Sequence, residues 1–280
     1  MSAPRTTPTL FGSAARIMDL SLGQMLWSRR SVFLALLLGF PVLLSIVLRA
    51  IDVMYRSGVW RQINGIKMGG AAIFGMMIWL LFIRFIVPVL GVFYGTSLIA
   101  DEVDDNTITY LFTRPIPRSA VLLGKYLAYL VCTILLVLPS VMIVFFLIVP
   151  IEGGSIGSAF PSLLLDFAML AIGLAAYGAV FALVGTRIKR PLIVGLVFAF
   201  GWEPAVMLFP GYLKRLTVAY YMQALVTHQM PQDSAVSLLM QVFREVPSVP
   251  VSVIALAAII AVTLWSAGRA VEHKEYVLEQ

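Results

Sequence analysis

The residue patterns in this sequence that could support covalent chemistry are few, and each has a simpler explanation. Residues 153–157, Gly-Gly-Ser-Ile-Gly, match the Gly-x-Ser-x-Gly pattern of serine hydrolases. That pattern requires a strand–turn–helix context, whereas here it lies between two apolar segments, which favours a flexible turn. The pair Gly124-Lys125 lacks the spacing of a phosphate-binding loop, and His228 and His273 have no second ligand at metal spacing. We therefore expect no catalytic residue, no metal site and no enzyme activity in this chain.

Three charged residues interrupt apolar segments and are the remaining candidates for a polar site: Arg84, Asp166 and Glu203. A charge inside a membrane is costly unless it is paired or hydrated, and it usually faces the interior of the helix bundle. We expect these residues to form an intramembrane charge cluster in which Arg84 pairs with Glu203 or, failing that, with Asp166. The sequence leaves three roles open: a cluster that lines or gates a pathway, a structural ion pair, and an Arg84 that extends alone to the lipid headgroups.

The composition indicates an integral membrane protein. Of the 280 residues, 60% are hydrophobic and only 12% are charged, about half the charged share of a soluble domain, and the mean hydropathy is +0.96. The net charge of +6 does not indicate nucleic-acid binding, because the basic residues gather at the ends of apolar segments, where orientation and lipid headgroups explain them. The single cysteine, Cys132, excludes an intramolecular disulfide.

Six segments are long and apolar enough, or nearly so, for a membrane-spanning helix of about 20 residues. We predict an all-α integral membrane protein with one transmembrane domain over residues 1–280. The approximate bounds of its six spans are 31–48, 70–99, 126–150, 163–185, 191–209 and 249–267.

Two further segments are semi-apolar. Residues 13–30 mix apolar and polar side chains and end with Trp27, Arg29 and Arg30, a pattern typical of a helix that lies in the headgroup layer. Residues 210–250 are too polar to span a membrane and too apolar for a free loop. They predict outer-surface or re-entrant helices before the last span.

The basic residues of short connectors predict the orientation. Arg187, Lys189 and Arg190 follow the fourth predicted span, whereas residues 151–161, after the third, contain no lysine or arginine. Because basic connectors stay on the cytoplasmic side, we expect a multi-pass protein of the cell membrane with both termini in the cytoplasm. At 1.5 Å per helical residue, the three intramembrane charges then fall in the outer half of the bilayer.

The segment 98–125 is a polar connector between the second and third predicted spans. Asn106 or Thr107 can cap a helix that begins near Ile108, and Pro115 ends it. The apolar residues that share one face of this helix are Ile108, Leu111 and Phe112. The residues alone leave two interpretations open: a surface helix that only links two spans, and a coupling helix that seats in a soluble partner.

The connector also carries a set of residues in one register: an acidic residue after the second span, a leucine turn, a Pro-Ile-x-Arg step and a Gly-Lys pair in front of the third span. These residues are Glu102, Thr107, Leu111, Arg114, Pro115, Ile116, Arg118, Gly124 and Lys125. This motif resembles the permease subunits of ABC-2 type ABC exporters. The rest of the chain is similar to that family in hydropathy and helix count.

The resemblance implies that the chain is the permease subunit of an ATP-driven exporter that works by alternating access. A second permease subunit, in a homodimer or heterodimer, would complete the membrane core, in contact with membrane lipids. A separate ATPase subunit would bind ATP and Mg, so that this chain itself holds no cofactor. The ATPase-coupling residues would be Glu102, Thr107, Ile108, Leu111, Phe112, Arg114, Pro115 and Arg118. The alternative is a scaffold or assembly component that transports nothing, since a fold does not dictate a function.

Overall fold

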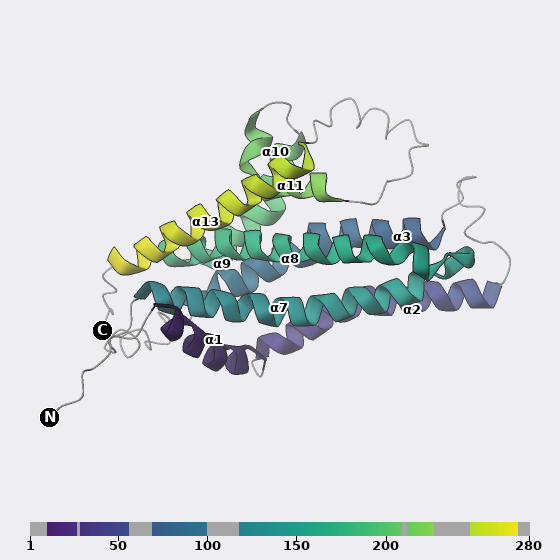
Figure 1. Ribbon diagram of the computed structural model, residues 1–280, viewed down its shortest axis with the longest axis horizontal. Coiled ribbons are helices and arrows are strands. Elements are labelled where there is room, and N and C mark those ends of the chain that lie inside the picture. The colour runs from purple at the N-terminus through teal and green to yellow at the C-terminus, as the bar shows by residue number, and fades with distance from the viewer. Residues whose placement is uncertain are drawn as a thin grey trace.

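The computed structural model describes residues 10–26, 29–55, 69–99, 118–208, 212–226 and 247–273. Every regular element in these ranges is a helix, as predicted (Figure 1). In chain order the long helices are α1 (Leu10–Leu26), α2 (Arg29–Tyr55), α7 (Arg118–Ile148), α8 (Ile156–Arg187) and α13 (Val249–His273).

Two further helices change their hydrogen-bonding pattern along their length. Residues Gly70–Ile99 form one long apolar helix. It consists of α3 (Gly70–Met77), the π-helical η2 (Ile78–Ile86), α4 (Val87–Leu90), the π-helical η3 (Gly91–Gly95) and a last turn. The other is made of α9 (Pro191–Leu196), the π-helical η5 (Val197–Trp202) and α10 (Glu203–Leu208). The short elements are η4 (Ile151–Gly153), η6 (Tyr212–Leu216) and α11 (Val218–Leu225).

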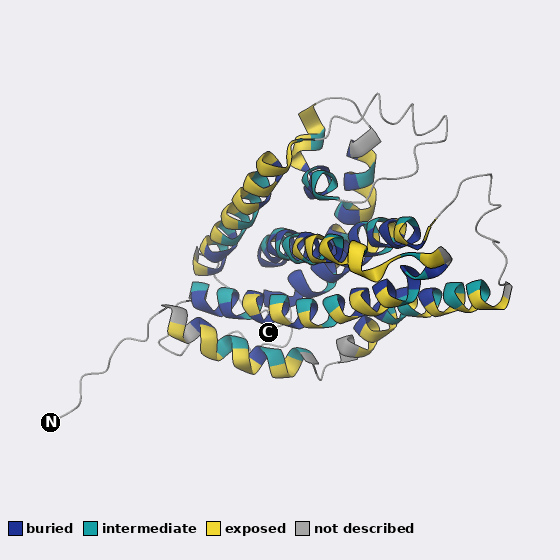
Figure 2. Cartoon of the chain, turned by 45° about the vertical axis from the view of Figure 1, so that its right-hand side comes forward, coloured by how far each residue is buried: buried dark blue, intermediate teal, exposed yellow. Residues whose placement is uncertain are grey.

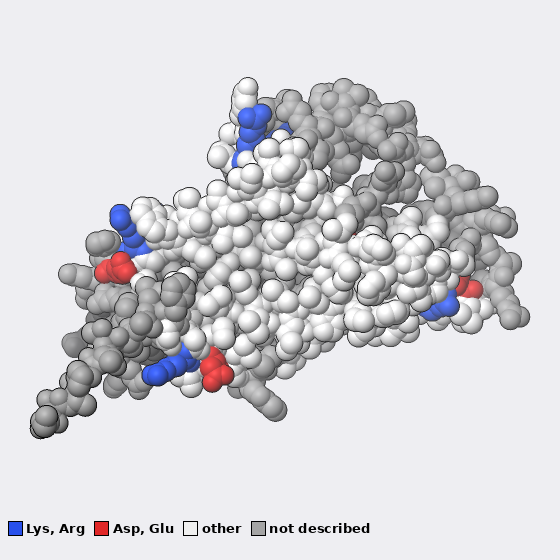
Figure 3. All heavy atoms as spheres, viewed as in Figure 1, with Lys and Arg blue, Asp and Glu red and all other residues white. Residues whose placement is uncertain are grey.

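Five of the described helices are long and apolar enough to cross a membrane, which supports a multi-pass membrane protein. They are Val32–Met54, Gly70–Ile99, Ser119–Ile148, Ile156–Arg187 and Val249–Glu272. The segment predicted as the fifth of six spans, 191–209, is a shorter apolar helix, Pro191–Val206. On the face in Figure 3, charged side chains gather at the two ends of the long helices and around η6, with a broad uncharged surface between them.

Several helices extend beyond the bounds predicted from the sequence. The first predicted span ends at 48, but α2 continues to Tyr55 through Arg49, which donates to Asp52 at 3.1 Å. The fourth predicted span corresponds to α8, which begins at Ile156 and not at residue 163. Charged or polar residues mark where a segment leaves the apolar layer, and the backbone hydrogen bonds of a helix continue past that point.

The core lies between α7, α8 and the Gly70–Ile99 helix (Figure 2). Glycines allow α8 and the Gly70–Ile99 helix to approach each other closely. A Cβ on Gly91 would lie 2.7 Å from the Tyr177 Cβ, and one on Gly95 would lie 2.9 Å from the Phe181 Cβ. The Gly-x-x-x-Gly step of this helix therefore serves packing within the bundle. By contrast, α2 and α13 are mostly exposed, as the yellow in Figure 2 shows.

Helix α1 packs along the first half of α7 (Figure 1). The contact is close because a Cβ on Gly124 would lie 2.6 Å from the Ala14 carbonyl oxygen and 2.8 Å from the Ile17 Cβ. The amphipathic segment predicted at 13–30 is therefore a helix that ends at Leu26, and its apolar side covers another helix. Gly124, part of the Gly-Lys pair noted in the sequence, makes this contact possible.

Candidate functional site

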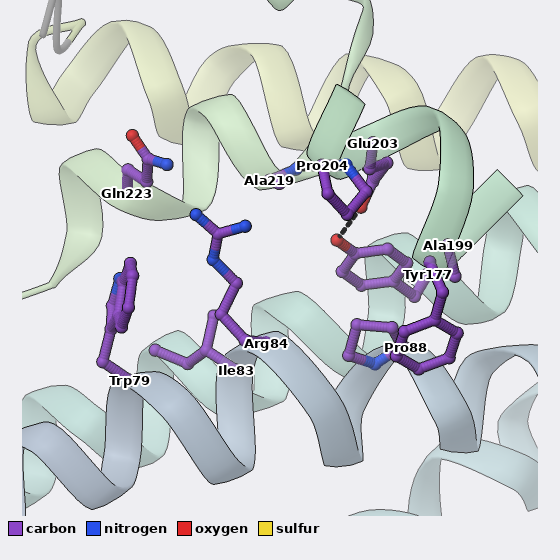
Figure 4. A pocket seen from close by; sticks show the side chains of 11 residues that line it. Trp79, Ile83, Arg84, Pro88, Tyr177, Ala199, Glu203, Pro204, Ala219 and Gln223 are labelled. Carbon is purple, nitrogen blue, oxygen red and sulfur yellow. Dashed lines mark hydrogen bonds between the residues drawn. The ribbon is translucent and has the colours of Figure 1, made fainter. Parts of the chain in front are cut away.

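A cavity lies where four parts of the chain meet (Figure 4). The cavity volume is about 40 Å³, within about 460 Å³ of space between side chains that includes open solvent. The lining residues are Trp79, Ile83, Arg84 and Pro88 from the Gly70–Ile99 helix, Tyr177 from α8, Ala199, Phe200, Glu203 and Pro204 from η5 and α10, and Ala219 and Gln223 from α11.

Both discontinuous helices are π-helical where they line this cavity, and each π segment ends two residues before a proline. Segment η2 ends at Ile86 before Pro88, and η5 ends at Trp202 before Pro204. A proline has no amide hydrogen and its ring clashes with the carbonyl of the preceding turn, so the backbone widens there to the i→i+5 pattern of a π-helix. The η2 residues that line the cavity fit this longer turn, because Ile83 and Arg84 follow Trp79 by four and five residues.

Glu203 is the most connected polar side chain of the cavity and is only 3% exposed. Its Oε2 accepts a short hydrogen bond from the Tyr177 hydroxyl. Its Oε1 accepts from the backbone amides of Val218 at 3.0 Å and Ala219 at 3.5 Å. These amides open α11, whose N-cap residue Thr217 makes no side-chain capping bond. Glu203 thus caps α11 from another helix, at the end where the helix dipole favours a negative charge.

Arg84 lies on the opposite wall, and its guanidinium carbon is 4.8 Å from the centre of the Trp79 ring, a cation–π contact. Figure 4 shows the guanidinium pointing across the cavity toward α11. The ion pair between Arg84 and Glu203 that we expected does not form in the described part of the chain, although both residues line the same cavity. The acceptor positions of the Glu203 carboxylate are directed to Tyr177 and to the amides of α11.

Asp166, the third residue of the predicted cluster, lies elsewhere. It is fully buried in α8, about three turns, or roughly 16 Å, before Tyr177 along the same helix. It does not line the cavity. The structure therefore brings together two of the three predicted intramembrane charges and separates the third from them.

The predicted coupling residues lie almost entirely outside the described residues. This applies to Glu102, Thr107, Ile108, Leu111, Phe112, Arg114 and Pro115. Arg118 is the first residue of α7, and its side chain is not described. The helix ends on both sides of this segment are described: Leu98 and Ile99 are buried, and Gly124 is packed against α1.

Sequence reasoning missed the partners that define the cavity. Tyr177 lies in an apolar run with no local signal of a polar role, and Gln223 lies in the semi-apolar segment after α10. The available signal was the position of the prolines, because Pro88 and Pro204 each follow a charged residue within an apolar helix. That pattern marks a local break in the helical hydrogen bonds next to a charge.

Comparison with models of known protein families gives a match over most of the chain. The model of the ABC-2 family transporter proteins matches residues 29–267. The matched region begins with α2 and includes α8, the cavity and most of α13. A search of curated protein sequences finds no match.

Proposed function

We propose that this chain, which belongs to the ABC-2 family of transporter proteins, exports its substrate by alternating access driven by a separate ATPase subunit. Family membership makes the chain a membrane permease component of an ABC transporter. The observation that carries the proposal is the family match over residues 29–267, together with five described helices long enough to span a membrane. The family match and the candidate spans extend over most of the chain, so the proposal does not depend on one short motif.

In the proposed assembly, two permease subunits, identical or different, surround the transport path within the lipid bilayer. Each subunit is a single domain with six spans, in which Pro191–Leu208 crosses as the fifth, and with both termini in the cytoplasm. The connector 98–117 then faces the cytoplasm, where the ATPase binds ATP and Mg. ATP binding would favour one of two conformations of the permease, and this population shift constitutes the transport step.

Close packing beside the connector supports a role in relaying movement. On one side, a Cβ on Gly185 of α8 would lie 2.3 Å from the Thr96 carbonyl oxygen, so the last turns before the connector press against α8. On the other side, Gly124 of α7 presses against α1. Because packed interiors do not compress, a displacement of the connector would pass into α8 and α1 instead of being absorbed locally.

The coupling role is tested by Glu102→Ala and Arg114→Ala, which remove charges from the two flanks of the predicted coupling helix. Charges at the edge of a docking surface contribute to partner specificity. We expect both variants to insert normally and to lose at least half of the permease-dependent ATP hydrolysis or of the co-purified ATPase. Arg49→Ala is the matched control, since Arg49 pairs with Asp52 near the end of α2 that the proposed orientation places outside.

Normal ATPase binding and stimulation in both connector variants would refute the coupling assignment. A permease that co-purifies with no ATPase at all would instead favour the scaffold alternative.

A further inference from the structure

We propose that the cavity at Arg84 binds the phosphate group of an anionic phospholipid from the surrounding membrane. This site is independent of the coupling mechanism, because it is inferred from the polar groups of the cavity and from the apolar side chains beside it.

The positive charge of Arg84 is not neutralised by a direct partner. In the part of the chain that the structure describes, its guanidinium contacts the Trp79 ring and makes no ion pair or hydrogen bond. The nearby carboxylate of Glu203 is already directed to Tyr177 and to the start of α11. A guanidinium within an apolar bundle needs an anion or water, and its planar set of donors matches the oxygen atoms of a phosphate.

A second polar group faces the same space. Gln223 of α11 lines the cavity on the side opposite the Gly70–Ile99 helix. Figure 4 shows its amide above Trp79, next to the guanidinium of Arg84. Among the described residues, the Gln223 side chain has no hydrogen-bond partner. An amide can donate to a phosphate oxygen, so one anion between Arg84 and Gln223 would satisfy both.

The apolar side chains beside the cavity favour a lipid over a water-soluble anion. Phe200 lines the cavity and is 40% exposed, and Phe85 beside it is 45% exposed. Their rings lie 5.8 Å apart, centre to centre, and they form an apolar rim on which acyl chains can pack. A free phosphate ion gains nothing from that rim.

The cavity lies partway along the bundle. Arg84 is near the middle of the Gly70–Ile99 candidate span, whereas α11 packs against α13 and lies beside the first turns of that helix in Figure 1. A phosphate bound here would therefore lie deeper than an ordinary headgroup, where the Arg84 charge offsets the cost of burying it.

The test measures phospholipid retained by the purified permease, by native mass spectrometry after titration with phosphatidylglycerol or phosphatidylcholine. We expect preferential retention of phosphatidylglycerol. In Arg84→Gln its apparent affinity should fall about tenfold, the scale of one charge-assisted hydrogen bond. Gln223→Leu, which leaves the charge in place, should lower the affinity by a smaller factor, about threefold.

Arg215→Gln is the matched control. Arg215 also stacks on an aromatic ring, that of Tyr212 at 4.7 Å, but it does not line the cavity, so lipid retention should be unchanged. The proposal is overturned if Arg84→Gln and Gln223→Leu, both with wild-type thermal stability, retain phosphatidylglycerol as the unmodified protein does. It is equally overturned if millimolar inorganic phosphate displaces the lipid completely, since the site would then select a free anion.

Discussion

At the scale of single residues, Glu203 connects three helices through one carboxylate. It belongs to α10, receives the hydroxyl of Tyr177 from α8 and caps the first two amides of α11. The Tyr177 hydroxyl and the Val218 amide are buried and would lack this partner without Glu203, and an unsatisfied buried donor costs about 1–3 kcal/mol. We infer that Glu203 contributes mainly by positioning α11 over the cavity.

A double-mutant cycle measures this network. Glu203→Leu should destabilise the protein by about 3 kcal/mol, because it removes the acceptor of several donors at once. Tyr177→Phe alone should cost about 1 kcal/mol and should cost almost nothing in the Glu203→Leu background, since the shared bond is already lost. Thermal unfolding of the four purified proteins gives the coupling energy.

The same measurement examines the pairing predicted from the sequence. Coupling between Arg84→Leu and Glu203→Leu should be weaker than coupling between Tyr177→Phe and Glu203→Leu. A stronger Arg84–Glu203 coupling, with the double mutant recovering stability, would mean that the two charges form an ion pair in the membrane.

At the scale of elements, the tightest contacts are made by glycines of adjacent helices. The Gly70–Ile99 helix and α8 meet at Gly91, Gly95 and Gly185, where a Cβ would approach the other helix to within 3 Å. Such contacts bring backbones together and leave little room for the helices to slide. The π segments η2 and η5 lie nearer the cavity, where the helices are less regular.

We expect Gly185→Ala to destabilise the protein by about 1–3 kcal/mol, the usual cost of overpacking a core, because the added Cβ would lie 2.3 Å from the Thr96 carbonyl oxygen. Gly201→Ala is the matched control, since the only neighbour of its added Cβ, in Val197, is 3.8 Å away. It should be neutral or stabilising by up to about 1 kcal/mol, from the better helix propensity of alanine. Thermal stability in one detergent compares the two, and equal losses would refute the packing argument.

At the scale of the whole molecule, the helices form one bundle in which exposed apolar faces surround a packed interior. The mostly exposed α2 and α13 are candidate spans, and their outward faces suit lipid or a partner subunit. The shorter helix Pro191–Val206 decides the count of spans. If it crosses, the described part of the chain contains six spans, an even number, which places Leu10 and His273 on the same side.

Cysteine labelling distinguishes these topologies. The single native Cys132 is buried and can be replaced by alanine to give an unreactive background. We expect Thr107→Cys to react with an impermeant maleimide only from the cytoplasmic side, and Ser155→Cys and Arg215→Cys only from the outer side. Reaction of Arg215→Cys from the cytoplasm would show that Pro191–Val206 does not cross the membrane.

The sequence by itself determined the class of protein and its family. Apolar runs of the length of a bilayer predict spanning helices regardless of how they pack, because the requirement comes from the lipid. For the same reason the approximate positions of α2, the Gly70–Ile99 helix, α7, α8 and α13 could be predicted. The resemblance of the 98–125 motif to ABC-2 permeases also agrees with the match over residues 29–267.

Only the tertiary structure decided which side chains meet. Counting residues along a helix gives the depth of a charge such as Arg84, but not the direction in which it points around the helix axis. That direction depends on packing and on local changes of pitch, and η2 and η5 change the pitch beside Arg84 and Glu203. The groups that donate hydrogen bonds to Glu203, the Tyr177 hydroxyl and the Val218 and Ala219 amides, lie 26, 15 and 16 residues away in the chain. No local sequence pattern encodes such contacts. The position of a charge along its helix was therefore predictable from sequence, whereas its partners required the fold.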